Sequence, residues 1–130
     1  MAPMAPLVRY WLKSAREDLR ATGTLLRAGH YRLAMFCCHL AMEKALKAVL
    51  QHQTGRLPPR LHDLRVLLTR AGLVPPLQLR QAIDRVADLS VPARYPGRLS
   101  TARLGWRRDM VERRIRQAGK VLQWCREQCR

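Results

Sequence analysis

The segment from Leu33 to Leu50 limits the possible folds more than any other part of this chain. Its only charged or imidazole side chains are His39, Glu43, Lys44 and Lys47. His39, Glu43 and Lys47 follow one another at four-residue steps, so on a helix they form one polar stripe on an otherwise apolar surface. A helix that is apolar nearly all round belongs at the centre of a bundle. The polar stripe is then either a satisfied structural network or the wall of a site.

Apolar residues recur at steps of three and four in the rest of the chain, without strand alternation or an internal repeat. We predict helices over residues 6–27, 31–52 and 61–71, a fourth ending near residue 89, and a last one over residues 106–128. Residues 90–105 contain two prolines and are predicted to be non-helical. The predicted fold class is therefore all-α, an up-and-down antiparallel four-helix bundle with an additional short helix.

The 130 residues are expected to form one domain, residues 1–130, large enough to bury a core without disulfides or metal. The apolar runs are too short to span a membrane, and the first residues lack the pattern of a secretory signal. We expect a cytoplasmic protein with no membrane association.

The formal net charge of +16 favours an anionic partner, because clustered cations attract phosphate groups. A second interpretation is equally open. Arginine outnumbers lysine 21 to 4 and asparagine is absent, a bias typical of a GC-rich genome.

The four cysteines lack zinc-ligand spacing with a partner histidine. We interpret them as structural thiols in a reducing compartment, with a redox or metal role for Cys125 and Cys129 as the alternative. No cofactor or metal is predicted.

Several motifs, taken in order, resemble the HEPN domain family. They are Trp11 with Asp18-Leu19, Gly29-x-Tyr31, His39-x-Ala41-x-Glu43-Lys44-Ala45-Leu46-Lys47-Ala48, His62-Asp63-Leu64 and Ala93-Arg94-Tyr95-Pro96. The resemblance implies a small helical bundle that commonly forms a homodimer. It also implies a minimal nucleotidyltransferase as partner, the two proteins acting as toxin and antitoxin. Many members of the family are metal-independent ribonucleases, and others bind nucleotide or RNA.

Ribonuclease members use an arginine and a histidine separated by four to six residues. Arg32 with His39 and Arg56 with His62 both have this spacing. Arginine is so frequent here, however, that two such matches among four histidines are expected by chance. The family motif also lies in the C-terminal half of the bundle, whereas this chain has no histidine after His62.

Ribonuclease chemistry therefore remains an alternative, with His62 and Arg56 as its candidate catalytic residues and His39 as a second possible base. Imidazole and guanidinium groups can supply the base, the acid and the cation that cleavage requires. The structural alternatives are that His62 braces the start of the third helix and that His39 bonds Glu43 within the bundle.

The candidate ligand-binding residues are His39, Glu43, Lys44, Lys47, Arg94, Tyr95 and Arg98. Lys44 could meet a phosphate or Asp18. Arg94 and Tyr95 combine a cation with a stacking ring, which suits a nucleotide, and the alternative is a loop anchor in which Arg94 pairs with Glu43.

The preferred hypothesis is a nucleotide- or RNA-binding component of a nucleotidyltransferase-linked module, acting through the polar stripe and the basic segment 94–108. The alternatives are a metal-independent ribonuclease toxin and a protein-interaction module with an acidic partner.

Overall fold

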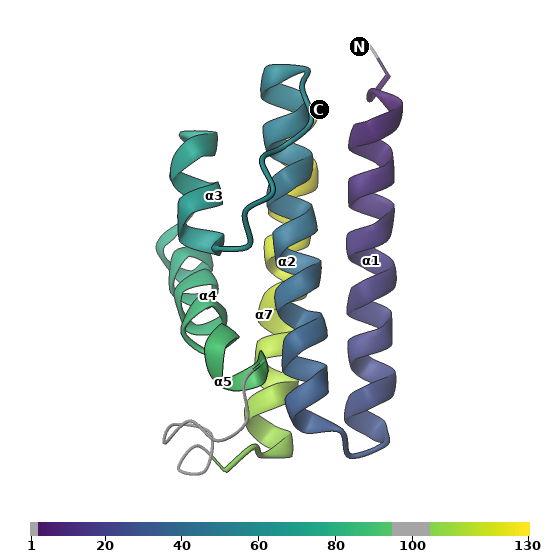
Figure 1. Ribbon diagram of the computed structural model, residues 1–130, viewed down its shortest axis with the longest axis vertical. Helices are drawn as coiled ribbons and strands as arrows, with labels where there is room; N and C mark the ends of the chain where they lie inside the picture. Colours follow the sequence, from purple (N-terminus) through teal and green to yellow (C-terminus); the bar gives the residue numbers. More distant parts are fainter. Residues whose placement is uncertain (1–2, 95–104) are drawn as a thin grey trace.

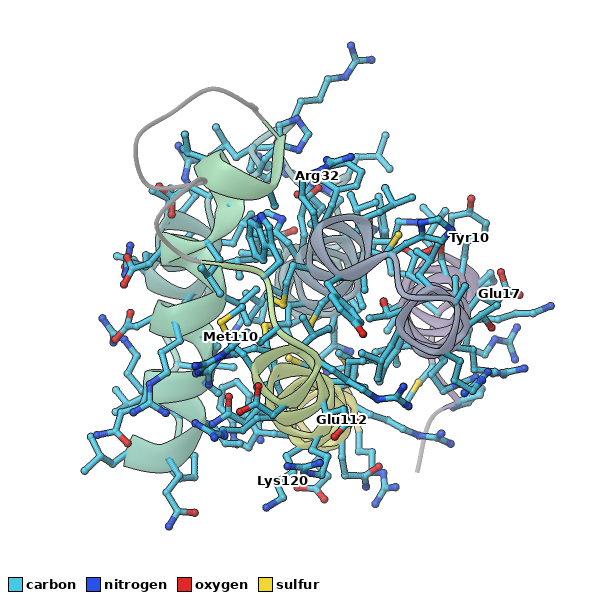
Figure 2. The ribbon with its side chains drawn as sticks, turned by 90° about the horizontal axis from the view of Figure 1, so that it is seen from below. Tyr10, Glu17, Arg32, Met110, Glu112 and Lys120 are labelled. Carbon is cyan, nitrogen blue, oxygen red and sulfur yellow. The ribbon has the colours of Figure 1, made fainter. Side chains whose placement is uncertain are left out.

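The computed structural model describes residues 3–94 and 105–130, and all regular structure in these ranges is helical (Figure 1). The helices are α1 (Pro6–Arg27), α2 (Tyr31–Thr54), α3 (Leu64–Ala71), α4 (Leu77–Asp88), α5 (Ser90–Arg94) and α7 (Arg108–Gln128). The three long helices α1, α2 and α7 run up and down beside one another, and α3, α4 and α5 lie on the side of α2 away from α1 (Figures 1 and 2). The all-α prediction is confirmed.

Helix α2 is the centre of the core, as its composition predicted. It packs against α1, α7 and α3, and 14 of its 24 residues are buried. Small side chains let the neighbouring helices approach closely, and they are fully buried: Ala34, Cys38, Ala41, Ala45 and Ala48. The large side chains of Met35, Met42 and Leu46 fill the remaining space.

The helix ends follow local chemistry. Pro6 occupies the first turn of α1, where its missing N–H costs nothing. Helix α2 ends at Thr54, and the next residue is Gly55, whose φ of 68° favours a residue without a Cβ. The carboxylate of Asp63 accepts hydrogen bonds from the backbone N–H groups of Arg65 and Val66, so it caps the first turn of α3.

Three predictions differ from the structure besides the end of α2, which lies at Thr54 rather than residue 52. Residues 61–63 precede α3 rather than belonging to it, because the Asp63 cap fixes its start at Leu64. The last helix begins at Arg108, two residues later than predicted. The third difference is α5, which forms within the segment predicted to be non-helical. Pro92 lies in the first turn of α5, where a proline is tolerated, and the N–H of Ala93 bonds the carbonyl of Leu89 at 3.0 Å.

Two further sequence predictions concern the membrane and the cysteines. Among the described residues no helix combines the length and hydropathy needed to cross a bilayer. All four cysteines are free thiols. The described part of the chain contains no group of three or more His, Cys, Asp or Glu residues that could hold a metal ion.

Candidate functional site

Glu43, near the middle of α2, is the hub of a partly buried polar network that we call the Glu43 cluster: His39, Glu43, Lys47 and His62. Only 5% of Glu43 and 7% of Lys47 are exposed. The ammonium group of Lys47 donates a hydrogen bond to Oε2 of Glu43 at 3.2 Å. Since a buried charge needs a partner of opposite sign, this pair satisfies much of the polar stripe within the bundle.

His62 joins the cluster from outside α2. Its Nδ1 lies 3.1 Å from the same Oε2 atom of Glu43, although 63% of its side chain is exposed. Asp63 caps α3 directly after His62, so the backbone beside the imidazole is fixed. A carboxylate can only accept, which assigns a proton to Nδ1 and leaves Nε2 as the second ring nitrogen for other partners.

His39 and Trp11 complete the surroundings of the cluster. Nδ1 of His39 lies 3.7 Å from Oε1 of Glu43, and only 2% of the histidine is exposed. The ammonium group of Lys47 lies 5.8 Å from the centre of the Trp11 ring on α1, within range of a cation–π interaction. The cluster therefore ties α1, α2 and the segment before α3 together.

A cavity of about 210 Å³, which we call the His62 pocket, lies beside the cluster. Its walls come from α2, α3, α4, α5 and the segment before α3: His39, His62, Asp63, Leu64, Arg65, Ala87, Ser90 and Val91. Pockets for drug-sized ligands measure about 300–1,000 Å³. The His62 pocket is smaller, so it matches a phosphate group, a ribose or one base better than a whole nucleotide.

The Arg65 side chain lines this pocket, and sequence reasoning did not select it. Hydrogen bonds to the carboxylates of Asp88 and Asp84 raise the pKa of Arg65. The sequence did contain a hint of this, because Arg65 follows His62 by three residues and both lie near the start of α3. Ser90 is a second lining residue that was missed, because α5 was not predicted.

Other predicted site residues lie elsewhere. Lys44 forms an ion pair with Asp18 at 2.7 Å and donates a hydrogen bond to Ser14 at 2.8 Å. Asp18 is thus one of the two partners predicted for Lys44, the other being a phosphate. Arg56 lines a separate cavity of about 550 Å³ beside the ends of α2 and α3, whereas His62 lines the His62 pocket. The structure does not bring Arg56 and His62 into one cavity.

The remaining predictions fall on Arg94, the last residue of α5, and on the segment after it. Tyr95 and Arg98 lie outside the described residues, as does the side chain of Arg94. Arg32, the arginine spaced before His39, donates to the backbone carbonyl of Ala93 at 2.8 Å and so joins α2 to α5.

Comparisons with known proteins agree with this architecture. The profile of the HEPN domain matches residues 8–128. ST0689, described as an archaeal HEPN homologue, is similar in structure with a TM-score of 0.76 and 26% identity, over 95% of this chain and 98% of that one. TT1696 from Thermus thermophilus is similar with a TM-score of 0.75 and 26% identity, over 93% and 97% of the two chains. No match was found among curated proteins. Because the profile spans nearly the whole chain, this protein belongs to the HEPN domain family.

Proposed function

We propose that this HEPN protein binds the phosphate or ribose of a nucleotide or RNA strand in the His62 pocket. The observation that carries the proposal is the imidazole of His62, which is 63% exposed at the pocket while its Nδ1 is held 3.1 Å from the buried carboxylate of Glu43. In the imidazolium form both ring nitrogens carry hydrogen, so Nε2 can donate to an anionic oxygen while Nδ1 donates to Glu43.

The charge of the chain supports an anionic ligand. The formal net charge is +16, and a charge of this sign attracts anionic ligands. The hydroxyl of Ser90 adds a neutral donor and acceptor suited to a ribose hydroxyl.

The basic segment after α5 has a place in this proposal. Ser90 and Val91 of α5 line the pocket, Arg94 is the last residue of that helix, and Tyr95 and Arg98 follow it in the sequence. We assign these three residues to the same ligand, Arg94 and Arg98 to phosphate and Tyr95 to base stacking.

Metal-independent RNA cleavage is the second candidate function. The specific observation in its favour is the imidazole–carboxylate pair of His62 and Glu43, which fixes the ring and leaves Nε2 to take a proton from a ribose 2′-hydroxyl. Arg65 would stabilise charge on the phosphorane. Arg56, the cation named from spacing, lines a different cavity from His62.

Labelled RNA incubated with the protein in EDTA separates the two functions. Intact RNA whose electrophoretic mobility shifts at low salt, with the shift weakened at least about tenfold by His62→Ala, supports binding. Cleavage that persists in EDTA and is lost in His62→Ala supports the ribonuclease. His52→Ala is the matched control, because His52 is an exposed histidine on α2 with no hydrogen bond or ion pair in the described part of the chain. If wild-type protein neither cleaves nor shifts RNA, RNA binding and RNA cleavage are both excluded.

The proposed module adds two expectations, a homodimer and a minimal nucleotidyltransferase partner. Light scattering during size-exclusion chromatography measures the first. Co-purification of the two proteins expressed together measures the second.

A further inference from the structure

Two adjoining cavities form a groove between α1 and α7. Helix α1 lies on the side of α2 away from α3, α4 and α5 (Figures 1 and 2). The two cavities have volumes of about 200 Å³ and about 410 Å³, and they share Leu12, Arg16 and Arg126. We call this surface the α1/α7 groove. It shares no lining residue with the His62 pocket.

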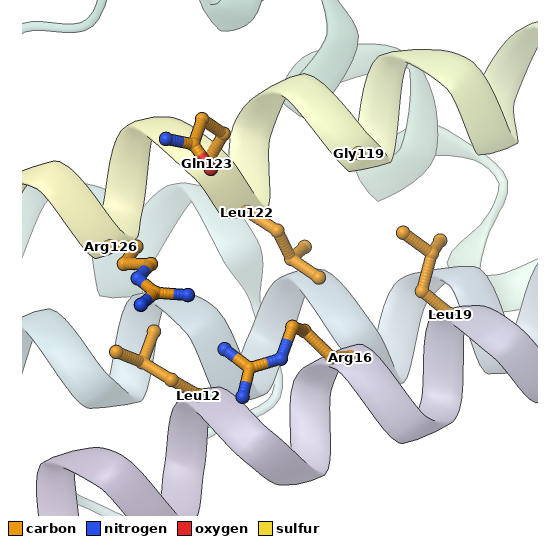
Figure 3. Close-up of a pocket in the computed structure, with 7 residues that line it drawn as sticks. All are labelled: Leu12, Arg16, Leu19, Gly119, Leu122, Gln123 and Arg126. Carbon is orange, nitrogen blue, oxygen red and sulfur yellow. The ribbon is translucent and has the colours of Figure 1, made fainter.

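The floor of the groove is apolar. Leu12 and Leu19 of α1 and Leu122 of α7 face one another along it (Figure 3). The two helices approach closely at one end, where a Cβ on Gly119 would lie 3.9 Å from the Leu19 side chain. Toward the start of α1 the groove also includes Tyr10, which is 63% exposed.

The rim is cationic. Arg16 and Arg126 extend from opposite walls with their guanidinium groups directed toward each other (Figure 3). Arg9 and Lys13 add two more cations, and no acidic residue is among the lining residues of either cavity. Neither Arg16 nor Arg126 makes an ion pair with any residue that the structure describes. Facing like charges over an apolar floor are unfavourable until an anion lies between them.

From these features we propose that the α1/α7 groove binds an amphipathic helical segment of another protein, with leucine-like side chains on the floor and carboxylates between the rim cations. Residues 6–19 of α1 extend about 20 Å, which accommodates roughly three to four turns of a docked helix. The apolar floor favours a peptide over a bare polyanion, and the cationic rim disfavours a second copy of this basic chain.

The probe is a fluorescein-labelled 15-residue peptide with leucine at positions i, i+3, i+4 and i+7 and glutamate elsewhere on the adjoining faces. Fluorescence anisotropy measures its dissociation constant. We expect saturable binding that is weakened at least about tenfold by the double reversal Arg16→Glu/Arg126→Glu. The matched control is Arg60→Glu/Arg70→Glu, which changes the net charge equally on exposed residues away from the groove and should alter binding less than about twofold.

Two comparisons can overturn the proposal. A peptide of the same composition in scrambled order tests the floor, and equal binding of both peptides would mean that charge alone is recognised. A single-stranded RNA oligomer tests the other occupant. If the groove reversal abolishes RNA binding while the peptide is unaffected, the surface is a nucleic-acid site and the peptide proposal is wrong. Circular dichroism of each variant confirms its helical content. Because the His62 pocket is separate, loss of RNA binding in His62→Ala leaves this test unaffected.

Discussion

Replacing Glu43 with glutamine tests whether the Glu43 cluster holds the bundle together. The substitution keeps the size of the side chain but removes the charge that Lys47 and His62 contact. Lys47 is then left 7% exposed in the core without its carboxylate. We expect Glu43→Gln to lower the free energy of unfolding by about 3 kcal/mol, within the roughly 3–5 kcal/mol typical of breaking a buried pair.

The magnitude follows from burial. An exposed i, i+4 pair stabilises a helix by only about 0.2–0.5 kcal/mol. At 3.2 Å and an effective dielectric constant of about 20, the gross attraction between Lys47 and Glu43 is about 5 kcal/mol. The side chains are 9% and 6% exposed, so water screens this attraction little, although the cost of burying both charges offsets much of it.

Lys47→Met supplies the second side of a double-mutant cycle. Methionine fills the volume beside Trp11, and Glu43 keeps His62 and His39 as neighbours. We expect Lys47→Met to lower the free energy of unfolding by less than Glu43→Gln does. The double variant should lose less free energy of unfolding than the two single variants lose in sum. The difference, which is the coupling energy, should be about 2 kcal/mol.

Urea unfolding followed by circular dichroism at 222 nm provides these free energies. The control is Glu112→Gln, which breaks the exposed i, i+4 pair between Arg108 and Glu112 and should cost less than about 0.5 kcal/mol. A loss below about 1 kcal/mol in Glu43→Gln, or a coupling energy near zero, would refute the structural role of the cluster.

Two further predictions concern the thiols and the α3 cap. Burial, with a smaller contribution from Asp18, raises the pKa of Cys37. Burial also raises the pKa of Cys38 to about 12 and that of Cys129 to about 11. The reactive thiolate form of these side chains is therefore scarce at pH 8. Iodoacetamide should modify the partly exposed Cys37 first and the buried thiols only in urea. Mass spectrometry after timed quenching measures the rate at each cysteine. Equal rates for Cys37 and Cys38 would contradict the prediction. Asp63→Ala removes two hydrogen bonds from the start of α3 and should lower stability by about 1 kcal/mol in urea unfolding, whereas a change below about 0.2 kcal/mol would exclude the cap.

Much of the bundle could be predicted because its helices carry strong local signals. The bounds predicted for α1 match Pro6–Arg27, since a proline at one end and a glycine soon after the other mark both termini. The central position of α2 followed from its composition. Helix α5 could not be predicted in the same way, because five residues containing a proline carry no periodic pattern, and its contacts with α2 and α4 come from tertiary packing.

The site was predictable only in part, for a similar reason. Periodicity placed His39, Glu43 and Lys47 on one stripe, and the structure confirms that they are neighbours. The contact between Glu43 and His62 joins residues 19 positions apart and depends on how the segment before α3 returns to α2. Arg114 is a related case, a residue in an arginine-rich helix that is only 9% exposed. Burial lowers its pKa, and its position in the core depends on which face of α7 meets α2 and α4.

The two sides of the Glu43–His62 contact should respond differently to substitution, and this difference separates stability from function. Glu43 is buried, so its replacement both destabilises the fold and releases His62. A binding defect in Glu43→Gln could therefore come from the lost stability or from the released imidazole. His62 is mostly exposed, and the net contribution of a single hydrogen bond, such as the one between its imidazole and Glu43, is about 1 kcal/mol. The free energy of unfolding of His62→Ala should therefore lie within about 1 kcal/mol of the wild-type value. The same variant should weaken RNA binding at least about tenfold. If the binding loss in a series of Glu43 and His62 variants instead tracks the loss of stability, the imidazole has no direct contact with the ligand and acts only as a brace for α3.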